Sequence, residues 1–317
     1  MIADTALSAQ LPFVLDATHF DFLGERYEGK VRDTYRQGDE RILITTDRLS
    51  CFDRVVTTVP FKGQVLNELA CHWFKLTEGI VANHIIEVPD PNVMRVRNCA
   101  ILPVEVVVRG YLAGSAWRDY AAGREVSGVR FPHGLRFGDR LPTPMLTPST
   151  KAAKGSHDEP ISEAEIVARG IVDRSVWEQV REVALRLFAV GQAESAKRGL
   201  ILVDTKYEFG LVGEELILAD EIHTLDSSRY WVAATLDERL GRGEDPEMLD
   251  KEPTRQWLLK QGFKGDGPIP LFTADHRVGI AHHYINCFER ITGRSFEAQV
   301  GPVLPRIESA LRRGGNP

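Results

Sequence analysis

The segment Ile201–Gly210 places charged residues at alternate positions within an apolar stretch. Asp204, Lys206 and Glu208 are each separated by one residue, so a β-strand would present all three side chains on a single face. Burying such a face costs free energy unless a partner or a ligand compensates the charges. We therefore interpret this strand as one wall of a functional site. The alternative is a solvated hairpin face that carries a Lys–Glu pair.

The following residues predict a return strand. Leu200–Asp220 has the pattern of a β-hairpin that turns near Gly213. If residues 213–215 form a three-residue loop, Asp220 lies directly opposite Glu208, with Cβ atoms about 5 Å apart. Two carboxylates so placed repel each other unless a cation lies between them. Mg²⁺ takes one or two protein carboxylates together with water and phosphate oxygens, so the hairpin predicts a magnesium site at this pair.

A second apolar strand, expected over Leu102–Arg109, delivers Arg109 at its end. Its alternation places Glu105 on the same face as Arg109. Ser115 is expected to start a helix that runs to about Ala122, and a helix N-terminus with a hydroxyl and an adjacent Arg suits an anion. The alternative is that Ser115 only caps the helix and Arg109 lies at the surface. We expect the capping role in either case.

Two further segments carry weaker signals. Gly29–Asp33 forms a glycine–lysine turn without the P-loop pattern, so a solvated Lys30 is the simpler interpretation of that segment alone. Thr147–Asp158 is crowded with hydroxyls, lysines and a His–Asp pair, and loops of this kind often order around phosphates, although many are mobile. The surrounding residues 123–160 show little periodicity, which indicates either disorder or a functional loop.

The remaining pattern mixes short strands with amphipathic helices. Strands are expected at residues 41–46 and 54–59, and helices at 67–76, after capping boxes at 162–165 and 175–178, and around 278–288. These elements predict an α+β protein with two lobes that meet near residue 100.

Composition and charge argue against several classes of protein. The 317 residues carry a net charge of −6, so neither nucleic acid nor a membrane is an expected partner. Any anionic ligand must then be bound by a few local Lys and Arg residues. Widely spaced cysteines argue against a zinc site and a disulfide framework. Because we find no signal peptide and no run of about 18 apolar residues, we expect a cytoplasmic protein.

The segments Leu102–Ser115 and Leu202–Gly210 resemble the two diagnostic motifs of the SAICAR synthetase family. The resemblance continues in order through residues 29–35, 46–53, 147–158 and 220–231, and covers roughly residues 25 to 235. Several long motifs in the correct order make a specific match, whereas any single one of them would not.

This resemblance implies a two-lobed fold with an ATP-grasp-like nucleotide site between the lobes. Residues 1–100 would form a β-rich lobe that contributes to ATP binding, and residues 101–317 an α+β lobe with the metal and ribonucleotide sites. The family uses ATP and Mg²⁺ to join L-aspartate to the carboxylate of carboxyaminoimidazole ribonucleotide through an acyl phosphate. The products are SAICAR, ADP and phosphate, in de novo purine biosynthesis, and the chain would act as a monomer or homodimer.

The resemblance also implies roles for individual residues. ATP phosphates would contact Lys30, Mg²⁺ would bind Glu208 and Asp220, the ribonucleotide phosphate would contact Arg109, Ser115 and Arg229, and Lys206, Asp204 and Asp158 would lie at the catalytic centre. The loop at residues 147–158 would close as a lid. The alternatives are a small-molecule kinase on a related nucleotide fold and a catalytically silent nucleotide-binding module.

Overall fold

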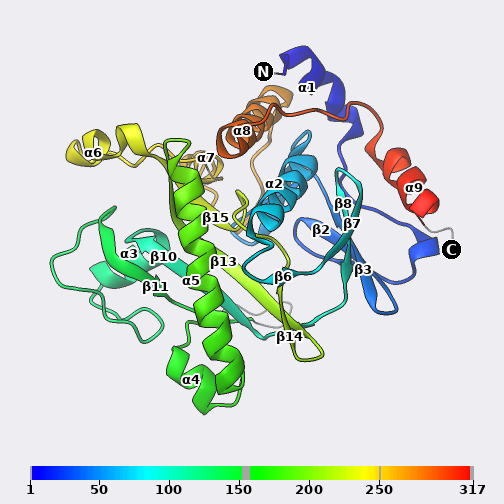
Figure 1. Ribbon diagram of the computed structural model, residues 1–317. Helices are drawn as coiled ribbons and strands as arrows, with labels where there is room; N and C mark the ends of the chain where they lie inside the picture. Colours follow the sequence, from blue (N-terminus) through cyan, green and yellow to red (C-terminus); the bar gives the residue numbers. More distant parts are fainter. Residues whose placement is uncertain (1, 152–157, 250, 315–317) are drawn as a thin grey trace. The chain divides into compact units, whose positions relative to one another are not determined.

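The computed structural model describes residues 2–151, 158–249 and 251–314, which divide into two compact units (Figure 1). The first unit comprises the described parts of residues 1–72, 84–98 and 249–317, and the second comprises residues 73–83 and 99–248. The mixture of helices and sheets confirms the expected α+β class. The described part of residues 249–317 groups with the first unit, whereas the family resemblance implies a lobe of residues 101–317. Helix α9 contributes apolar residues to the core of the first unit.

The first unit is built around an antiparallel sheet in the order β1-β2-β3-β8-β7. Its core contains Tyr35, Ile42, Ile44 and Val93 from the sheet, and it is completed by α9. The strands are β1 (Arg26–Glu28), β2 (Arg32–Gln37), β3 (Glu40–Thr45), β7 (Ile85–Asp90) and β8 (Val93–Arg97). The helices are α1 (Asp4–Gln10), α7 (Glu252–Lys260), α8 (Ala274–Thr292) and α9 (Val303–Gly314), with 3-10 turns at Leu11–Phe13 and Asp21–Leu23.

A separate hairpin in the first unit joins β4 (Arg48–Cys51) to β5 (Arg54–Thr58), and α2 (Lys62–Thr77) follows it. Phe52 and Asp53 form the two-residue turn, and their φ angles are 52° and 59°. Positive φ at both turn positions matches the right-handed twist of the flanking strands. The hairpin thereby presents the Asp53 side chain at its tip.

The second unit contains a larger sheet in the order β11-β10-β13-β14-β6, to which β9, β12 and β15 are attached. The long strand β13 pairs with β10, β14, β15 and β9, so it forms the centre of the sheet. The strands are β6 (Ala82–Asn83), β9 (Ala100–Ile101), β10 (Val104–Tyr111), β11 (Arg140–Leu146), β12 (Ser149–Thr150), β13 (Leu200–Val212), β14 (Glu215–Ala219) and β15 (Ser228–Val232). The helices are α3 (Gly114–Ala121), α4 (Glu163–Ala168), α5 (Arg174–Ala196) and α6 (Ala233–Gly241).

Helix α5 covers one face of this sheet and packs along β13 (Figure 1). A Cβ atom at Gly110 of β10 would lie 2.7 Å from Gln192 Nε2 and 3.1 Å from Phe188 Cε1, both on α5. Gly110 therefore faces the helix closely. Because successive residues of a strand point to opposite faces, Arg109 is directed away from α5.

Local signals predicted some helix starts and missed others. The capping box at Ser162–Glu165 is confirmed, since the Ser162 hydroxyl accepts from the Glu165 N–H and Glu165 bonds back to Ser162. The second predicted box, at Ser175, is wrong because α5 begins at Arg174, and Asp173 at its N-cap makes no side-chain hydrogen bond. Among the described helices, none is both long and apolar enough to cross a lipid bilayer.

Candidate functional site

A row of alternating charges runs across the sheet of the second unit. Arg109 of β10 pairs with Asp204 of β13, and Asp204 pairs in turn with Arg229 of β15. Arg109 Nη1 donates to Asp204 Oδ2 at 3.3 Å, and Arg229 Nη1 donates to the same oxygen at 2.5 Å. Arg109 and Asp204 are buried, with 7% and 5% of their surface exposed. Asp204 therefore orients two guanidinium groups at once.

Ser115 contacts Arg109 and does not cap helix α3. The Arg109 guanidinium donates from Nη2 to Ser115 Oγ at 3.1 Å and from Nε to Thr147 Oγ1 at 2.8 Å. The expected capping role is wrong because the helix begins one residue earlier, at Gly114, and its N-cap residue Ala113 makes no side-chain hydrogen bond. Ser115 thus lies in the first turn, where its hydroxyl binds Arg109.

Gly114 makes room for Arg229. Its φ is +57°, and a Cβ atom there would lie 2.5 Å from Nη1 and Nη2 of Arg229. A larger residue would displace the guanidinium, so the glycine allows the start of α3 and Arg229 to approach closely. Arg229 is thereby brought next to Arg109 and the N-terminus of α3, although it lies more than 100 positions later in the sequence.

The row of Arg109, Asp204 and Arg229 has a surplus of positive charge. Burial lowers the pKa of the Arg109 guanidinium; Asp204 opposes this shift, and Arg229 adds to it. The pKa therefore falls below its usual value, but from so high a starting point that the group keeps its charge. Two guanidinium groups thus share one carboxylate, which is the electrostatic arrangement that suits an additional anion.

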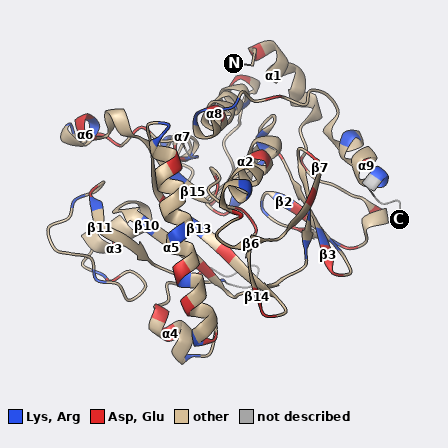
Figure 2. Cartoon of the chain, viewed as in Figure 1, with Lys and Arg blue, Asp and Glu red and all other residues tan. Residues whose placement is uncertain are grey.

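An acidic cluster surrounds Lys206 of β13. It consists of Glu105 of β10, Glu208 of β13 and Asp220, which follows β14. Figure 2 shows acidic residues within β13. Lys206 Nζ donates to Glu105 Oε1 at 2.5 Å and lies 4.0 Å from Glu208 Oε1. Lys151 donates to Glu208 Oε2. The alternation along β13 thus brings Lys206 and Glu208 to one face, and Glu105 of β10 joins them there.

Asp220 follows the last residue of β14. Ala219 pairs with Glu208, and the hairpin turn consists of residues 213–214. The expected register, in which Asp220 lies opposite Glu208, is therefore wrong by one residue. Asp220 lies outside the strand with φ 66°, so strand alternation does not set its direction. Its charge nevertheless raises the pKa of both Glu208 and Lys206.

Electrostatic effects oppose one another in this cluster. Burial raises the pKa of Glu208 and the charge of Asp220 raises it further, while Lys151 and Lys206 lower it; the net shift is upward. Burial lowers the pKa of Lys206, but Glu105 and Glu208 outweigh that effect and leave it raised. Lys206 therefore remains protonated, whereas ionised Glu208 lacks full compensation.

The acidic cluster fits a divalent cation. The carboxylates of Glu105, Glu208 and Asp220 outnumber the ammonium groups of Lys151 and Lys206, so the cluster is negative when all are ionised. Within the part of the chain that the structure describes, no group of three or more His, Cys, Asp or Glu side chains is placed to hold a metal ion. Mg²⁺ needs only one or two protein carboxylates when phosphate oxygens and water complete its coordination.

Lys30 belongs to the first unit, where its turn is firmly supported. The buried Arg48 guanidinium donates to the carbonyl oxygens of Gly29 at 3.0 Å and Lys30 at 3.1 Å, and to Asp33 Oδ1 at 2.8 Å. Lys30 Nζ lies 2.5 Å from Asp53 Oδ1, and both side chains are more than half exposed. The supported backbone of this turn thus presents an exposed cationic side chain to solvent.

The predicted lid lies partly outside the described residues, which omit 152–157. Two residues at its start contact the site, since Thr147 accepts from Arg109 and Lys151 donates to Glu208. Asp158, at its end, is exposed.

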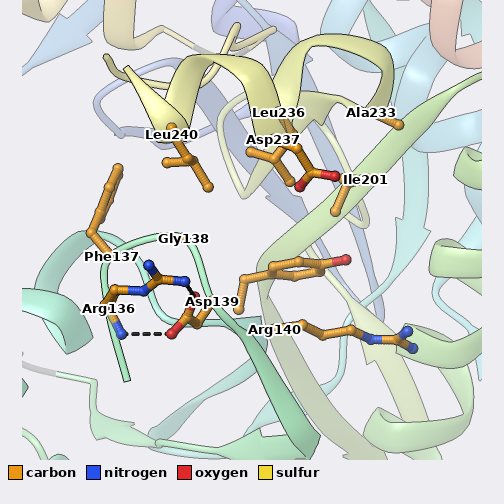
Figure 3. A pocket seen from close by; sticks show the side chains of 12 residues that line it. Arg136, Phe137, Gly138, Asp139, Arg140, Ile201, Ala233, Leu236, Asp237 and Leu240 are labelled. Carbon is orange, nitrogen blue, oxygen red and sulfur yellow. Dashed lines mark hydrogen bonds and ion pairs between the residues drawn. The ribbon is translucent and has the colours of Figure 1, made fainter. Parts of the chain in front are cut away.

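A cavity of about 610 Å³ lies in the same unit beside α6 (Figure 3). Leu236, Asp237 and Leu240 of α6 form one wall, and residues 136–140 form the opposite wall. None of the residues to which we assigned a role in the sequence lines it. The candidate site is therefore the charged face of β10, β13 and β15 and not this cavity.

Comparison with known proteins decides the family. The family model of SAICAR synthetase matches residues 25–268. The chain belongs to the SAICAR synthetase family. Similar curated proteins include the phosphoribosylaminoimidazole-succinocarboxamide synthase of Legionella pneumophila (strain Lens), which is 48% identical over 307 residues, or 94% of this chain and 97% of the relative. The enzyme of the same name from Bacteroides thetaiotaomicron is 44% identical and covers 93% of this chain and 96% of its own length.

Solved structures of the SAICAR synthetase family share the fold. The SAICAR-synthase from Saccharomyces cerevisiae complexed with SAICAR has a TM-score of 0.79 and 30% identity, over 89% of this chain and 99% of that one. A SAICAR synthetase (Type-2) in complex with ADP has a TM-score of 0.65 and 28% identity, over 86% and 100%. The chain is therefore an ATP-dependent ligase of purine biosynthesis, as the sequence motifs implied.

Residues without a role in the sequence interpretation also contact the site. Glu105, Thr147 and Lys151 bond to Lys206, Arg109 and Glu208 respectively. Glu105 had a detectable signal, because a carboxylate in the middle of an apolar strand needs a buried partner. Thr147 and Lys151 lie in a segment whose sequence showed many polar groups but not which of them point inward.

Proposed function

We propose that this chain joins L-aspartate to the carboxylate of carboxyaminoimidazole ribonucleotide, with Mg-ATP as the energy source. One observation supports this most strongly: a row with surplus positive charge and a cluster with surplus negative charge lie side by side on β10 and β13. The imidazole ribonucleotide carries a phosphate, which suits the positive row. Its carboxylate must lie next to Mg-ATP, and the negative cluster suits the metal ion. One similar structure is a complex with SAICAR and another is a complex with ADP, which agrees with this assignment.

The chemistry requires activation of the carboxylate. An amine does not displace oxide from a carboxylate at neutral pH. Transfer of the ATP γ-phosphoryl group to one carboxylate oxygen forms an acyl phosphate and ADP. The aspartate amine then attacks the acyl carbon, the C–O bond breaks, phosphate leaves with that oxygen, and the amine loses a proton. The protein acts mainly by placing three anionic reactants together and compensating their charge.

We assign the acidic cluster to the metal and the reacting carboxylate. Glu208 and Asp220 would hold Mg²⁺, which supplies charge neutralisation to the β- and γ-phosphates when bound. Lys206 lies on the strand face next to Glu208 and remains protonated, so it can bind the oxyanion that forms as the phosphoryl group is transferred. Glu105 orients its ammonium group.

We assign the row of Arg109, Asp204 and Arg229 to the ribonucleotide phosphate. Guanidinium groups bind phosphate in a bidentate manner, and the N–H groups at the start of α3 add donors. Ser115 supports this arrangement because its hydroxyl accepts from Arg109. Asp204 would keep both guanidinium groups in place for the phosphate.

We assign Lys30 to the ATP phosphates, within an N-terminal lobe that contributes to nucleotide binding. Its ammonium group is exposed and pairs, among the described residues, with the exposed Asp53, so a phosphate can replace that partner at little cost. The loop at residues 147–158 would exclude water from the acyl phosphate. Asp158, at the end of that loop, would join the catalytic centre on closure.

ADP release tests the proposal. It should be measured with ATP and Mg²⁺ in the presence and absence of each of the other two reactants. Stoichiometric amide and ADP only when both the imidazole carboxylate and aspartate are present would support the ligase. Continued ADP formation with a hydroxyl compound and without aspartate would instead indicate a kinase, and no ADP under any condition would indicate a silent binding module.

A further inference from the structure

Residues 220–227 connect the two halves of the proposed site. Asp220 begins this segment directly after β14, and Arg229 is the second residue of β15, which follows the segment. His223 lies near its middle with no exposed surface and φ 50°. A left-handed backbone is unfavourable for a residue with a side chain, so the surrounding contacts must hold His223 in this conformation.

The His223 ring is tied to the strand that carries the acidic cluster. Its Nε2 shares a hydrogen bond of 2.6 Å with Tyr207 Oη, and both residues are fully buried. Tyr207 lies between Lys206 and Glu208 in β13, on the opposite face. The Tyr230 hydroxyl donates to the His223 carbonyl oxygen at 2.7 Å. These bonds fix the connecting segment to β13 and β15 at the same time.

Helix α5 leaves space for this ring. A Cβ atom at Gly191 would lie 2.4 Å from His223 Cε1 and 2.6 Å from Leu202 Cδ2. Glycine in the interior of a helix is less favourable than alanine. Gly191 therefore lowers the stability of α5 but leaves space for the His223 imidazole. Burial also lowers the pKa of His223 to about 3, which keeps the ring neutral and suits a hydrogen bond with a phenol.

We propose that His223 is a positioning residue: through its hydrogen bond with Tyr207, it holds the segment between Asp220 and Arg229, sets Asp220 relative to Glu208 and supports Arg229 in its ladder pairing with Asp204. This inference rests on the proposed roles of Asp220 and Arg229. Asp220 follows the last residue of β14, so strand alternation does not set the direction of its side chain. The anchored His223 ring three residues later fixes the backbone of the segment that joins Asp220 to Arg229, and this segment links the metal site to the phosphate site.

Variants of His223 can separate positioning from simple packing. In His223→Gln the side-chain amide reaches the position of Nε2, so the bond to Tyr207 can re-form. In His223→Asn the amide reaches only the position of Nδ1, which has no hydrogen-bond partner among the described residues. Tyr207→Phe removes the same bond from the other side with the loss of a single oxygen, and it serves if the Asn variant does not fold.

Steady-state kinetics of the full chain should be measured with varied Mg²⁺ and varied imidazole nucleotide. Loss of a buried hydrogen bond typically costs about 1 to 3 kcal/mol, so we expect His223→Asn and Tyr207→Phe each to raise the half-saturating Mg²⁺ concentration and the KM for the imidazole nucleotide by roughly 5- to 140-fold. His223→Gln should recover most of this loss. Val180→Ala, a buried α5 change outside the site, is the control for lost stability and should leave both constants unchanged.

Asp220→Asn distinguishes failure of this inference from failure of the proposed function. If it leaves the Mg²⁺ constant unchanged, the metal assignment itself is wrong. If it raises that constant while Tyr207→Phe and His223→Asn lower only the melting temperature, as Val180→Ala does, the metal assignment stands and His223 only packs. A rise in both constants that His223→Gln reverses would establish the positioning role.

Discussion

Asp204 Oδ2 accepts hydrogen bonds from both Arg109 and Arg229, at 3.3 and 2.5 Å. One carboxylate therefore aligns two guanidinium groups that come from different strands. The Ser115 hydroxyl contacts Arg109, and Gly114 lies close to the Arg229 guanidinium. The pairing of β10, β13 and β15 thus places both guanidinium groups of the proposed phosphate site next to Asp204.

Replacing Arg109 should weaken binding of the imidazole nucleotide selectively. Arg109→Lys keeps the charge but loses the planar fork that binds Ser115, Thr147 and Asp204 together. We expect the KM for the imidazole nucleotide to rise by roughly 10- to 100-fold, while the KM for ATP changes little. Initial-rate measurements with each substrate varied in turn provide the test. An equal or larger effect on ATP would show that Arg109 serves the other phosphate.

Glu208→Gln should abolish turnover without lowering the stability of the fold. Because the folded pKa of Glu208 is raised, its contribution to stability is fully present below the unfolded pKa and is lost as pH rises through the folded value. A neutral isostere removes this loss at pH 7, so without Mg²⁺ the variant should unfold at an equal or higher temperature than the parent. Turnover should be abolished. A variant that keeps its activity would remove Glu208 from the metal site.

Asp47 should make the stability of the chain depend on pH. Its carboxylate accepts from the backbone N–H groups of Leu15 at 2.8 Å and Gly63 at 2.9 Å, and burial raises its pKa from 3.8 to about 6. The stabilisation present below pH 4 is therefore lost as pH rises through 6, and the loss amounts to about 3 kcal/mol. Urea unfolding of the parent and of Asp47→Asn between pH 4 and 8 should show a shallower dependence in the variant. Parallel curves would contradict the shifted pKa.

Much of the site was predictable because its main residues lie in regular strands. Alternation along Asp204, Lys206 and Glu208 predicted a charged face, and the hairpin that follows is present. The register failed by one residue because the turn has two residues where we expected three. Asp220 still raises the pKa of Glu208, although it lies outside the strand with a positive φ, and no residue pattern indicated that conformation.

Other features depended on contacts between distant parts of the chain. Glu105 and Lys206 are 101 positions apart, so neither segment alone indicated the pair. Strand β11 was not expected within residues 123–160 because it contains Pro142 and Pro144. Proline cannot donate to a ladder, but β11 lies at the edge of the sheet, where this is tolerated. Nothing in the sequence near residue 249 indicated that the chain returns to the first unit.

The acyl phosphate is the central claim of this account, and the fate of one oxygen atom tests it directly. The imidazole ribonucleotide should be prepared with heavy oxygen in both carboxylate positions and turned over with ATP and aspartate. Mass spectrometry of the inorganic phosphate should then find one heavy oxygen per amide formed, because the oxygen that accepts the phosphoryl group leaves with it. Amide formation with unlabelled phosphate would contradict the acyl phosphate, even though the overall ligation would stand.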